Sequence, residues 1–403
     1  MMRRGPRPLL LHLTLAMLKS TASLAMRPNS AAGWPSLSAG SPSWNAVAAE
    51  IAAALAGHTG AFSHDILMET MRQDAGLIAG IAAYRRHPYA RRLPDPPTIW
   101  EEGGSRVLDY AQPGAAGPPV LFVPSLVNRA YVLDLAENRS LLRFMAAQGV
   151  PARLLDWGWP GETERLFTLT DYIAGRLERA AMAMGEPVIL AGYCMGGLLT
   201  TALAQRRPDL VRGLALLATP WDFHAADPEA ARNLAAMLPL LEPALAFSHT
   251  LPVDLLQMLF ALLDPWGIAT KYRGFAKLDP ASPRALGFVA LEDWLNDGIP
   301  LAGAVARETL SGWYGANSTA SGEWRIAGMA IDPTTIDIPA FAAIPAADRI
   351  VPPQSARPLA ELLPRARLIE PKAGHIGMAA GASAETALWR PLLAWIRGLE
   401  TAH

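Results

Sequence analysis

The feature that most constrains the fold is an alternation of short apolar runs and amphipathic stretches between residues 120 and 217. Runs such as VLFVP (120–124) and VILAGY (188–193) have the length and composition of strands that are buried on both faces. Stretches with helical spacing separate these runs, and SLLRFMAAQGV (140–150) ends at a glycine. Strands and helices that alternate in this way predict an α/β fold with a doubly wound, mostly parallel sheet.

Breaks in this pattern predict the domain organisation. Residues 27–46 are rich in Ser, Pro and Gly and predict a linker, and RRHPYARRLPDPP (85–97) marks a boundary with its four prolines. We therefore predict an N-terminal region over 1–95, made of a lead segment, a linker and helices, and a catalytic domain over 96–403. From about 221 to 331 the chain is a long helical stretch rich in Leu, Met and Trp, which predicts a cap over the carboxyl ends of the strands.

Charge and cysteine content exclude several classes of protein. The chain carries 35 Lys and Arg against 36 Asp and Glu, a net charge of −1, so no global field attracts nucleic acid. Its single cysteine, Cys194, excludes an internal disulfide and a cysteine-based zinc cluster, and a lone thiol fits a reducing compartment. The sequence contains no P-loop, dinucleotide fingerprint or metal-ligand cluster, so we expect neither a bound cofactor nor a metal.

The first 26 residues have the outline of a signal peptide, with a basic start, a short apolar run and small residues near Ala25. Against this, His12 and Lys19 interrupt the run, which is also shorter than the roughly 20 apolar residues that cross a bilayer. We therefore expect a retained lead segment and a cytoplasmic protein, with secretion as the alternative.

The stretch GYCMGG places Cys194 directly after an apolar run and before a helical one. Residues 192–196 fit the pattern G-x-C-x-G, which is a nucleophile elbow with cysteine in place of serine. Small residues flank such an elbow because the turn is sharp, and the N–H groups of the following helix favour a thiolate and a developing oxyanion. We therefore predict that Cys194 is a nucleophile, rather than the buried small side chain that a free cysteine usually is.

A cysteine nucleophile needs a base, and the base needs a residue that orients it. Asp348 and His375 each follow a predicted strand downstream of the cap, in the order nucleophile, acid, histidine that the elbow scaffold uses. We predict these two as acid and base, with Asp222 in ATPWDFH as the alternative acid.

The oxyanion hole of this scaffold takes one backbone N–H from the residue after the nucleophile, which is Met195. The second comes from the loop after an early strand, and we predict Leu126, with Ser125 as the alternative.

From about residue 95 to 397 the sequence resembles the polyhydroxyalkanoate synthase family, which joins 3-hydroxyacyl units from coenzyme A thioesters into polyester. The matching segments are GYCMGG, FVPSLVNRAYVLDL, LLDWGWP, LEDWLNDG, GEWRIAGMAIDPTTIDIP, DRIVPP and GHIG. The resemblance is closest to the short, two-subunit class. It implies the α/β-hydrolase fold, with Cys194 as nucleophile, His375 as base, and Asp348 as an acid that also helps to activate the incoming hydroxyl.

The resemblance further implies an acyltransferase whose substrates are 3-hydroxyacyl-coenzyme A and a growing polyester chain. The implied partners are a second copy or a small partner subunit, and the surface of polyester granules. Trp266, Trp294 and Trp313 in the cap either line an acyl channel or pack in the core. Arg349 departs from the family pattern, which often has histidine after the acid.

Two other functions remain open at this stage. The first is a cysteine hydrolase on the same fold, either an acyl-coenzyme A thioesterase or an intracellular polyester depolymerase. The second is a granule-associated protein that has lost turnover.

Overall fold

The structure is a computed structural model that describes residues 3–25 and 59–400. The chain divides into two compact units. The first unit consists of Met1–Tyr89 and Asp264–Glu292, and the second consists of Ala90–Leu263 and Asp293–His403. The linker that we predict over 27–46 lies outside the described residues.

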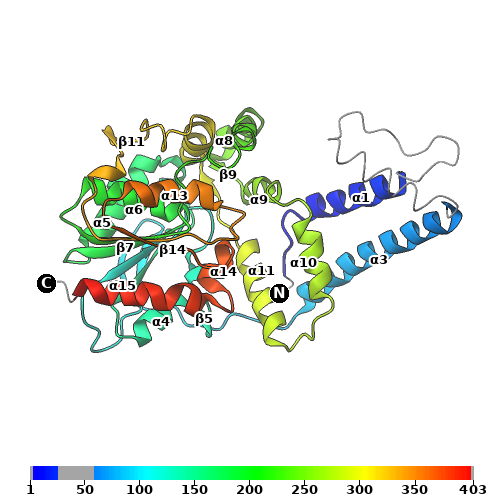
Figure 1. Cartoon of the computed structure of the whole chain (residues 1–403), viewed down its shortest axis with the longest axis horizontal. Helices are drawn as coiled ribbons and strands as arrows, with labels where there is room; N and C mark the ends of the chain where they lie inside the picture. The colour runs from blue at the N-terminus through cyan, green and yellow to red at the C-terminus, as the bar shows by residue number, and fades with distance from the viewer. Residues whose placement is uncertain (1–2, 26–58, 401–403) are drawn as a thin grey trace. The chain divides into compact units, whose positions relative to one another are not determined.

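An eight-stranded sheet forms the centre of the second unit (Figure 1). Its order is β1-β2-β6-β3-β7-β8-β13-β14, and the pairs from β6 to β14 are parallel, whereas β1 and β2 join the edge antiparallel. Strands β3, β7 and β13 are buried at every residue, which is why their sequences are continuously apolar. The predicted mostly parallel sheet is confirmed. The strands are β1 (Thr98–Glu102), β2 (Ser105–Asp109), β3 (Val120–Val123), β6 (Ala152–Asp156), β7 (Val188–Tyr193), β8 (Val211–Leu217), β13 (Ala340–Ala343) and β14 (Ala366–Ile369).

Helices cover both faces of this sheet, with α6 and α13 on one face and α4 and α15 on the other (Figure 1). Gly149 and Gly185 lie where the sequence predicts helix ends, and their φ angles of +83° and +79° are ones that glycine adopts without strain. The α-helices are α4 (Leu141–Ala147), α5 (Glu178–Met182), α6 (Met195–Arg206), α13 (Pro353–Leu362), α14 (His375–Ala380) and α15 (Arg390–Glu400). Shorter or wider helical segments are η1 (Ala130–Leu133), η2 (Glu164–Leu166), η3 (Asp171–Leu177), η5 (Pro333–Thr335) and η6 (Glu385–Trp389).

The chain between β8 and β13 contains the predicted cap, and all of it except residues 264–292 belongs to the second unit. Its helices in the second unit are α7 (Pro228–Ala235), α8 (Leu238–Ser248), α9 (Val253–Ala261), α12 (Gly303–Arg307) and the π-helix η4 (Glu308–Gly315). Three two-stranded antiparallel sheets complete this unit: β4 (Asp134–Ala136) with β5 (Arg139–Ser140), β9 (Thr250–Leu251) with β10 (Leu301–Ala302), and β11 (Arg325–Ile326) with β12 (Met329–Ala330).

The first unit differs from the predicted N-terminal region, because it includes residues 264–292, which the sequence places in the cap. It is built from α1 (Leu9–Ala25), α3 (Thr59–Arg86), α10 (Gly267–Phe275) and the first part of α11 (Pro283–Asn296). The reason is a shared core, in which Tyr272 and Phe275 of α10 are buried together with Leu77 and Tyr84 of α3. This contact joins segments about 190 residues apart, so no local pattern reveals it.

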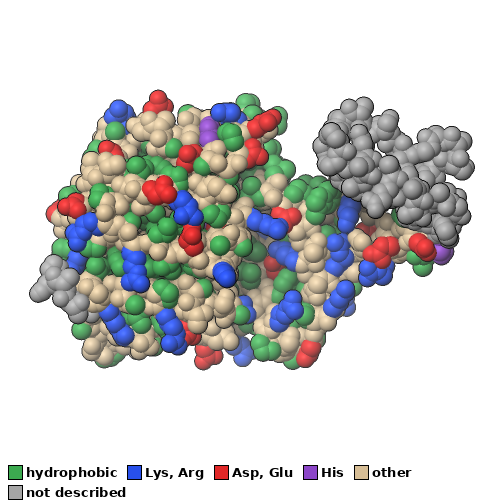
Figure 2. Space-filling view, viewed as in Figure 1, with side chains coloured by type: hydrophobic (Ala, Val, Ile, Leu, Met, Phe, Trp, Pro, Cys, Tyr) green, Lys and Arg blue, Asp and Glu red, His purple; other side chains and the backbone are tan. Residues whose placement is uncertain are grey.

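Charges of both signs are interspersed on the face of the molecule shown in Figure 2, in keeping with the net charge of −1. Among residues 3–25 and 59–400, no helix has both the length and the apolar character needed to span a membrane.

Candidate active site

Cys194 lies at the turn between β7 and α6. Its φ of +56° and ψ of −127° belong to a conformation that residues other than glycine rarely adopt. The Cys194 amide donates a hydrogen bond to the Leu217 carbonyl at 2.8 Å, and the Cys194 carbonyl accepts one from the Gly197 amide at 2.9 Å. The side chain therefore stands at a sharp strand–turn–helix corner, which is the geometry of a nucleophile elbow.

Two glycines make this corner possible. A Cβ atom at Gly196 would lie 2.1 Å from the Val123 carbonyl oxygen, and one at Gly197 would lie 1.8 Å from Oγ1 of Thr219. Both distances are far below van der Waals contact, so a side chain at Gly196 would push against the backbone after β3, and one at Gly197 would displace the Thr219 side chain. The start of α6 is thus packed closely against the end of β3 and against the chain that leaves β8.

Asp348 and His375 meet beside this corner, as the sequence predicts for acid and base. The Asp348 Oδ2 atom lies 2.6 Å from Nδ1 of His375, and both side chains are buried. The other carboxylate oxygen, Oδ1, accepts hydrogen bonds from the amides of Ile350 and Val351, each at 2.9 Å. The two amides hold the carboxylate in one orientation, and the carboxylate in turn presents the other ring nitrogen of His375 for chemistry.

The electrostatic environment favours a charged His375. Burial lowers the pKa of His375, but the negative charge of Cys194 and hydrogen bonds to Asp348 and Cys194 outweigh burial and raise this pKa to about 10. The Tyr193 ring lies 5.2 Å from the His375 ring, and its hydroxyl donates to the His375 carbonyl at 3.4 Å. Burial and the nearby charges of Cys194 and Asp348 raise the pKa of Tyr193 well above its ordinary value.

The alternative acid, Asp222, has other partners. Its Oδ1 atom accepts hydrogen bonds from the His224 amide and from Nδ2 of Asn317, both at 2.9 Å. The carboxylate that binds His375 is therefore that of Asp348.

The loop after β3 also lies near Cys194, because the carbonyls of Val123 and Pro124 pack against Gly196. Met195 is the first residue of α6, and the first amides of a helix have no acceptor within the helix. Leu126 is buried, while the Ser125 hydroxyl accepts a hydrogen bond from the Val127 amide at 3.1 Å. The oxyanion roles of Met195 and Leu126 stay predictions.

Tyr314, in η4, is close enough to Cys194 for the charge of the sulfur to affect it, and no sequence pattern predicts this proximity. Burial and the charge of Cys194 raise the pKa of the Tyr314 hydroxyl to about 12. Tyr314 and Cys194 are 120 positions apart, so their proximity leaves no mark in the sequence pattern.

The three tryptophans that we predict as channel or core residues lie in different surroundings in the structure. The Nε1–H group of Trp294 donates to the Arg129 carbonyl at 2.8 Å, and Trp313 is buried against Phe223 and Trp324. Trp266 is 46% exposed and belongs to the first unit.

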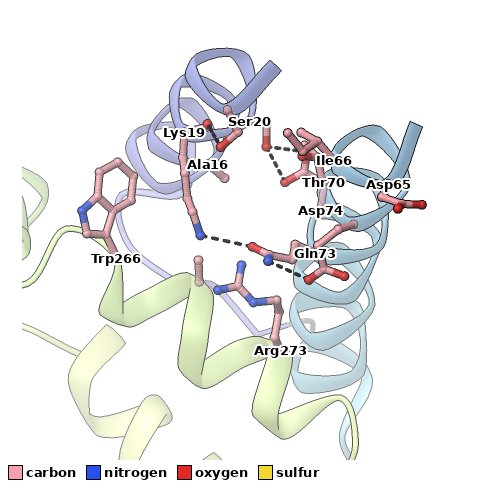
Figure 3. Close-up of a pocket in the computed structure, with 13 residues that line it drawn as sticks. Ala16, Lys19, Ser20, Asp65, Ile66, Thr70, Gln73, Asp74, Trp266 and Arg273 are labelled. Carbon is pink, nitrogen blue, oxygen red and sulfur yellow. Dashed lines mark hydrogen bonds between the residues drawn. The ribbon is translucent and has the colours of Figure 1, made fainter. Parts of the chain in front are cut away.

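Trp266 lines an open pocket of about 490 Å³ in the first unit, formed by α1, α3 and α10 (Figure 3). The polar side chains around it bond to one another, since Lys19 donates to Gln73 at 3.1 Å and Ser20 donates to Asp74. Cys194, Asp348 and His375 all lie in the second unit. Within the part of the chain that the structure describes, no group of three or more His, Cys, Asp and Glu side chains could hold a metal ion.

Comparison with known proteins gives a family and a set of relatives. The family described as the alpha/beta hydrolase fold matches residues 155–381. The Poly(3-hydroxyalkanoate) polymerase subunit PhaC of Allochromatium vinosum is 30% identical over 294 residues, which are 70% of this chain and 82% of that protein. The protein of the same name from Haloferax mediterranei is 29% identical over 74% of this chain, and the chain spans 62% of its length. Among solved structures, the monoacylglycerol lipase of Paleococcus ferrophilus aligns with a TM-score of 0.48 and 17% identity, over 73% of this chain and 98% of its own.

Proposed function

We propose, from the premise that the chain belongs to the poly(3-hydroxyalkanoate) polymerase family of the α/β-hydrolase fold, that it polymerises 3-hydroxyacyl groups from coenzyme A thioesters. The acyl group is carried on Cys194 during the reaction. The observation that carries this proposal is the hydrogen-bonded Asp348–His375 pair beside a cysteine held in an elbow turn. The nucleophile of this site is a thiol. Transfer of an acyl group from the thiol of coenzyme A to the thiol of Cys194 exchanges one thioester for another, which suits a thioester substrate.

In the loading step, the Cys194 thiolate attacks the carbonyl carbon of the coenzyme A thioester. Amides at the start of α6 stabilise the oxyanion, and we assign this role to Met195 together with Leu126. The carbon–sulfur bond to coenzyme A breaks, and protonated His375 gives its proton to the departing sulfur. One thioester replaces another, so the step is nearly isoenergetic.

In the elongation step, a hydroxyl group attacks the thioester on Cys194. Neutral His375, oriented by Asp348, takes the hydroxyl proton as the new carbon–oxygen bond forms. The bond between the carbonyl carbon and the Cys194 sulfur breaks, and the thiolate is restored. The product is an oxygen ester, which is more stable than the thioester, so elongation runs downhill. The reaction needs no resident cofactor, since coenzyme A enters and leaves with the substrate.

We also propose partners and a location that follow from this reaction. The helices between β8 and β13 that belong to the second unit (α7, α8, α9, α12 and η4) act as a cap that limits the access of water to the acyl group. A second copy or a small partner subunit completes the active assembly, as the resemblance to the two-subunit class implies. The protein works in the cytoplasm, to which its coenzyme A substrates are confined, at the surface of polyester granules.

The test is to give the purified protein 3-hydroxybutyryl-coenzyme A and to measure free thiol and polymer together. Thiol release with polymer supports the proposal, and it disappears in Cys194→Ala. Thiol release with free 3-hydroxybutyrate instead identifies a hydrolase. If no free thiol is released, the assay is repeated after adding a cell extract depleted of this protein, which would supply a missing partner subunit. Continued inactivity then contradicts the proposal.

A further inference from the structure

The segment that leaves β8 holds the end of η4 through three hydrogen bonds. His224 donates from Nε2 to the Tyr314 carbonyl at 2.7 Å, since a carbonyl only accepts. Asn317 donates from Nδ2 to Asp222 and accepts from the Phe223 amide, each at 2.9 Å. We call Asp222, Phe223, His224 and Asn317 the clamp.

The clamp is tied to the elbow at its other end. Leu217, the last residue of β8, accepts the hydrogen bond from the Cys194 amide, and Thr219 is in close contact with Gly197. Asp222 follows three residues later, and its amide donates to the Ser355 carbonyl of α13 at 3.0 Å. The position of the clamp relative to the Cys194 turn is therefore set by short, direct contacts.

What the clamp positions is the side chain of Tyr314. The Tyr314 ring packs edge-on against the Phe223 ring, with centroids 4.8 Å apart. Its hydroxyl has no hydrogen-bond partner among the residues that the structure describes. A tyrosine hydroxyl is protonated throughout the neutral range, so it acts there as a hydrogen-bond donor. Tyr314 also lies in a π-helix, a geometry that is frequent at functional sites.

In the proposed reaction, we assign the oxyanion to donors from the start of α6 and from the loop after β3. Tyr314 comes from a different element, beyond the end of β8. A hydroxyl on that element would serve a second oxygen of the acyl group rather than the oxyanion, and in a 3-hydroxyacyl group that oxygen is on carbon 3.

We propose that the Tyr314 hydroxyl hydrogen-bonds the 3-oxygen of the acyl group on Cys194, and that the clamp holds Tyr314 in place for this contact. The inference rests on the proposed function and adds a determinant of substrate class to it. A site that hydrogen-bonds a substrate hydroxyl discriminates strongly against the analogue that lacks it, because a polar group is then left unpaired. Tyr314 therefore selects 3-hydroxyacyl groups over plain acyl groups.

The experiment compares loading of Cys194 by 3-hydroxybutyryl-coenzyme A and by butyryl-coenzyme A, measured as the single-turnover burst of free thiol in the full-length protein. We expect the native protein to prefer the hydroxylated ester by at least about tenfold, and Tyr314→Phe to lose most of that preference. Asn317→Ala should lose it too, and the double variant should lose no more than either single variant. The matched control is Tyr172→Phe, which removes a buried hydroxyl from a different π-helix, η3, and should keep the preference.

Three results would overturn the inference. The first is a native protein that loads both esters equally, and the second is a Tyr314→Phe variant with an unchanged ratio. The third is an equal slowing of both esters in Tyr314→Phe, which would make Tyr314 a structural residue only. Each of these leaves Cys194-dependent loading intact, so the proposed function survives them. Absence of any loading in the native protein would contradict both.

Discussion

Asp348 uses its two carboxylate oxygens for different partners, and this division matters for its role. Two backbone amides bind Oδ1 and fix the orientation of the carboxylate, and this orientation directs Oδ2 at His375. A carboxylate fixed in this way stabilises the charged ring of His375 and also keeps the neutral ring aimed at a proton. The first role serves loading and the second serves elongation.

We predict that Asp348→Asn affects the two steps unequally. The start of α6 and His375 still favour the Cys194 thiolate, so loading survives, whereas a hydroxyl has a much higher pKa and needs the fully oriented base. A rapid-quench experiment should find about one burst of coenzyme A per site and little polymer. Asp209→Asn, which changes an exposed carboxylate that pairs with Arg207, is the control and should keep making polymer. Equal losses in both steps would reduce Asp348 to an orienting residue.

We predict that Cys194→Ala abolishes acyl transfer and lowers the pKa of His375. The charge of Cys194 is the strongest influence that raises this pKa to about 10, and burial, which lowers it, remains after the substitution. Titration of the His375 ring by NMR should therefore shift to lower pH in the variant, while thermal unfolding stays cooperative. A ring that titrates near pH 10 in both proteins would mean that Asp348 alone sets the pKa.

At the scale of elements, the elbow depends on how closely α6 approaches β3 and the chain after β8. Glycine is required at this approach because a single Cβ would meet backbone or side-chain atoms. This close contact brings the start of α6, the end of β3 and the chain after β8 together around the Cys194 sulfur.

We predict that Gly196→Ala destabilises the protein by about 1–3 kcal/mol, because the new methyl group would overlap the Val123 carbonyl. Denaturant unfolding measures the loss, and labelling of Cys194 by a thiol reagent should change with it. Gly398→Ala in α15 is the control, since nothing lies within 4 Å of its added Cβ. That change should stabilise the helix by about 0.5–1 kcal/mol. Equal effects at both sites would contradict the packing argument.

At the scale of the whole molecule, the chain leaves the second unit after α9 and returns to it within α11. Residues 264–292 contribute to the core of the first unit, and Glu292 at the end of this stretch is buried there. It binds Lys271 Nζ at 2.6 Å and the Tyr272 hydroxyl at 3.0 Å.

We predict that Glu292→Ala weakens the first unit by about 1–3 kcal/mol, because the buried Tyr272 hydroxyl and the half-buried Lys271 ammonium lose a charged acceptor. Hydrogen exchange on the full-length protein should find lost protection in α3 and α10, with protection retained in β7 and α6. Glu69→Ala removes an exposed partner of Arg72 in the same unit and is the control, with little change expected. Equal loss of protection in both units would show that they unfold together.

The sequence by itself determined the features that depend on neighbouring residues. The parallel sheet is visible because buried strands are continuously apolar, and the corner at Cys194 is visible because a sharp turn needs small residues around it. The order of Cys194, Asp348 and His375 along the chain can likewise be read from the sequence directly.

Only the tertiary structure decided which distant residues meet. It grouped residues 264–292 with the first unit, joined Asp348 rather than Asp222 to His375, and tied Asp222 and His224 to the end of η4 beside Cys194. These contacts span 27 to about 190 positions. The residues that meet in these contacts are determined by shape and by hydrogen-bond geometry in the folded chain. Neither shape nor hydrogen-bond geometry produces a repeating pattern of residues that could be seen in the sequence.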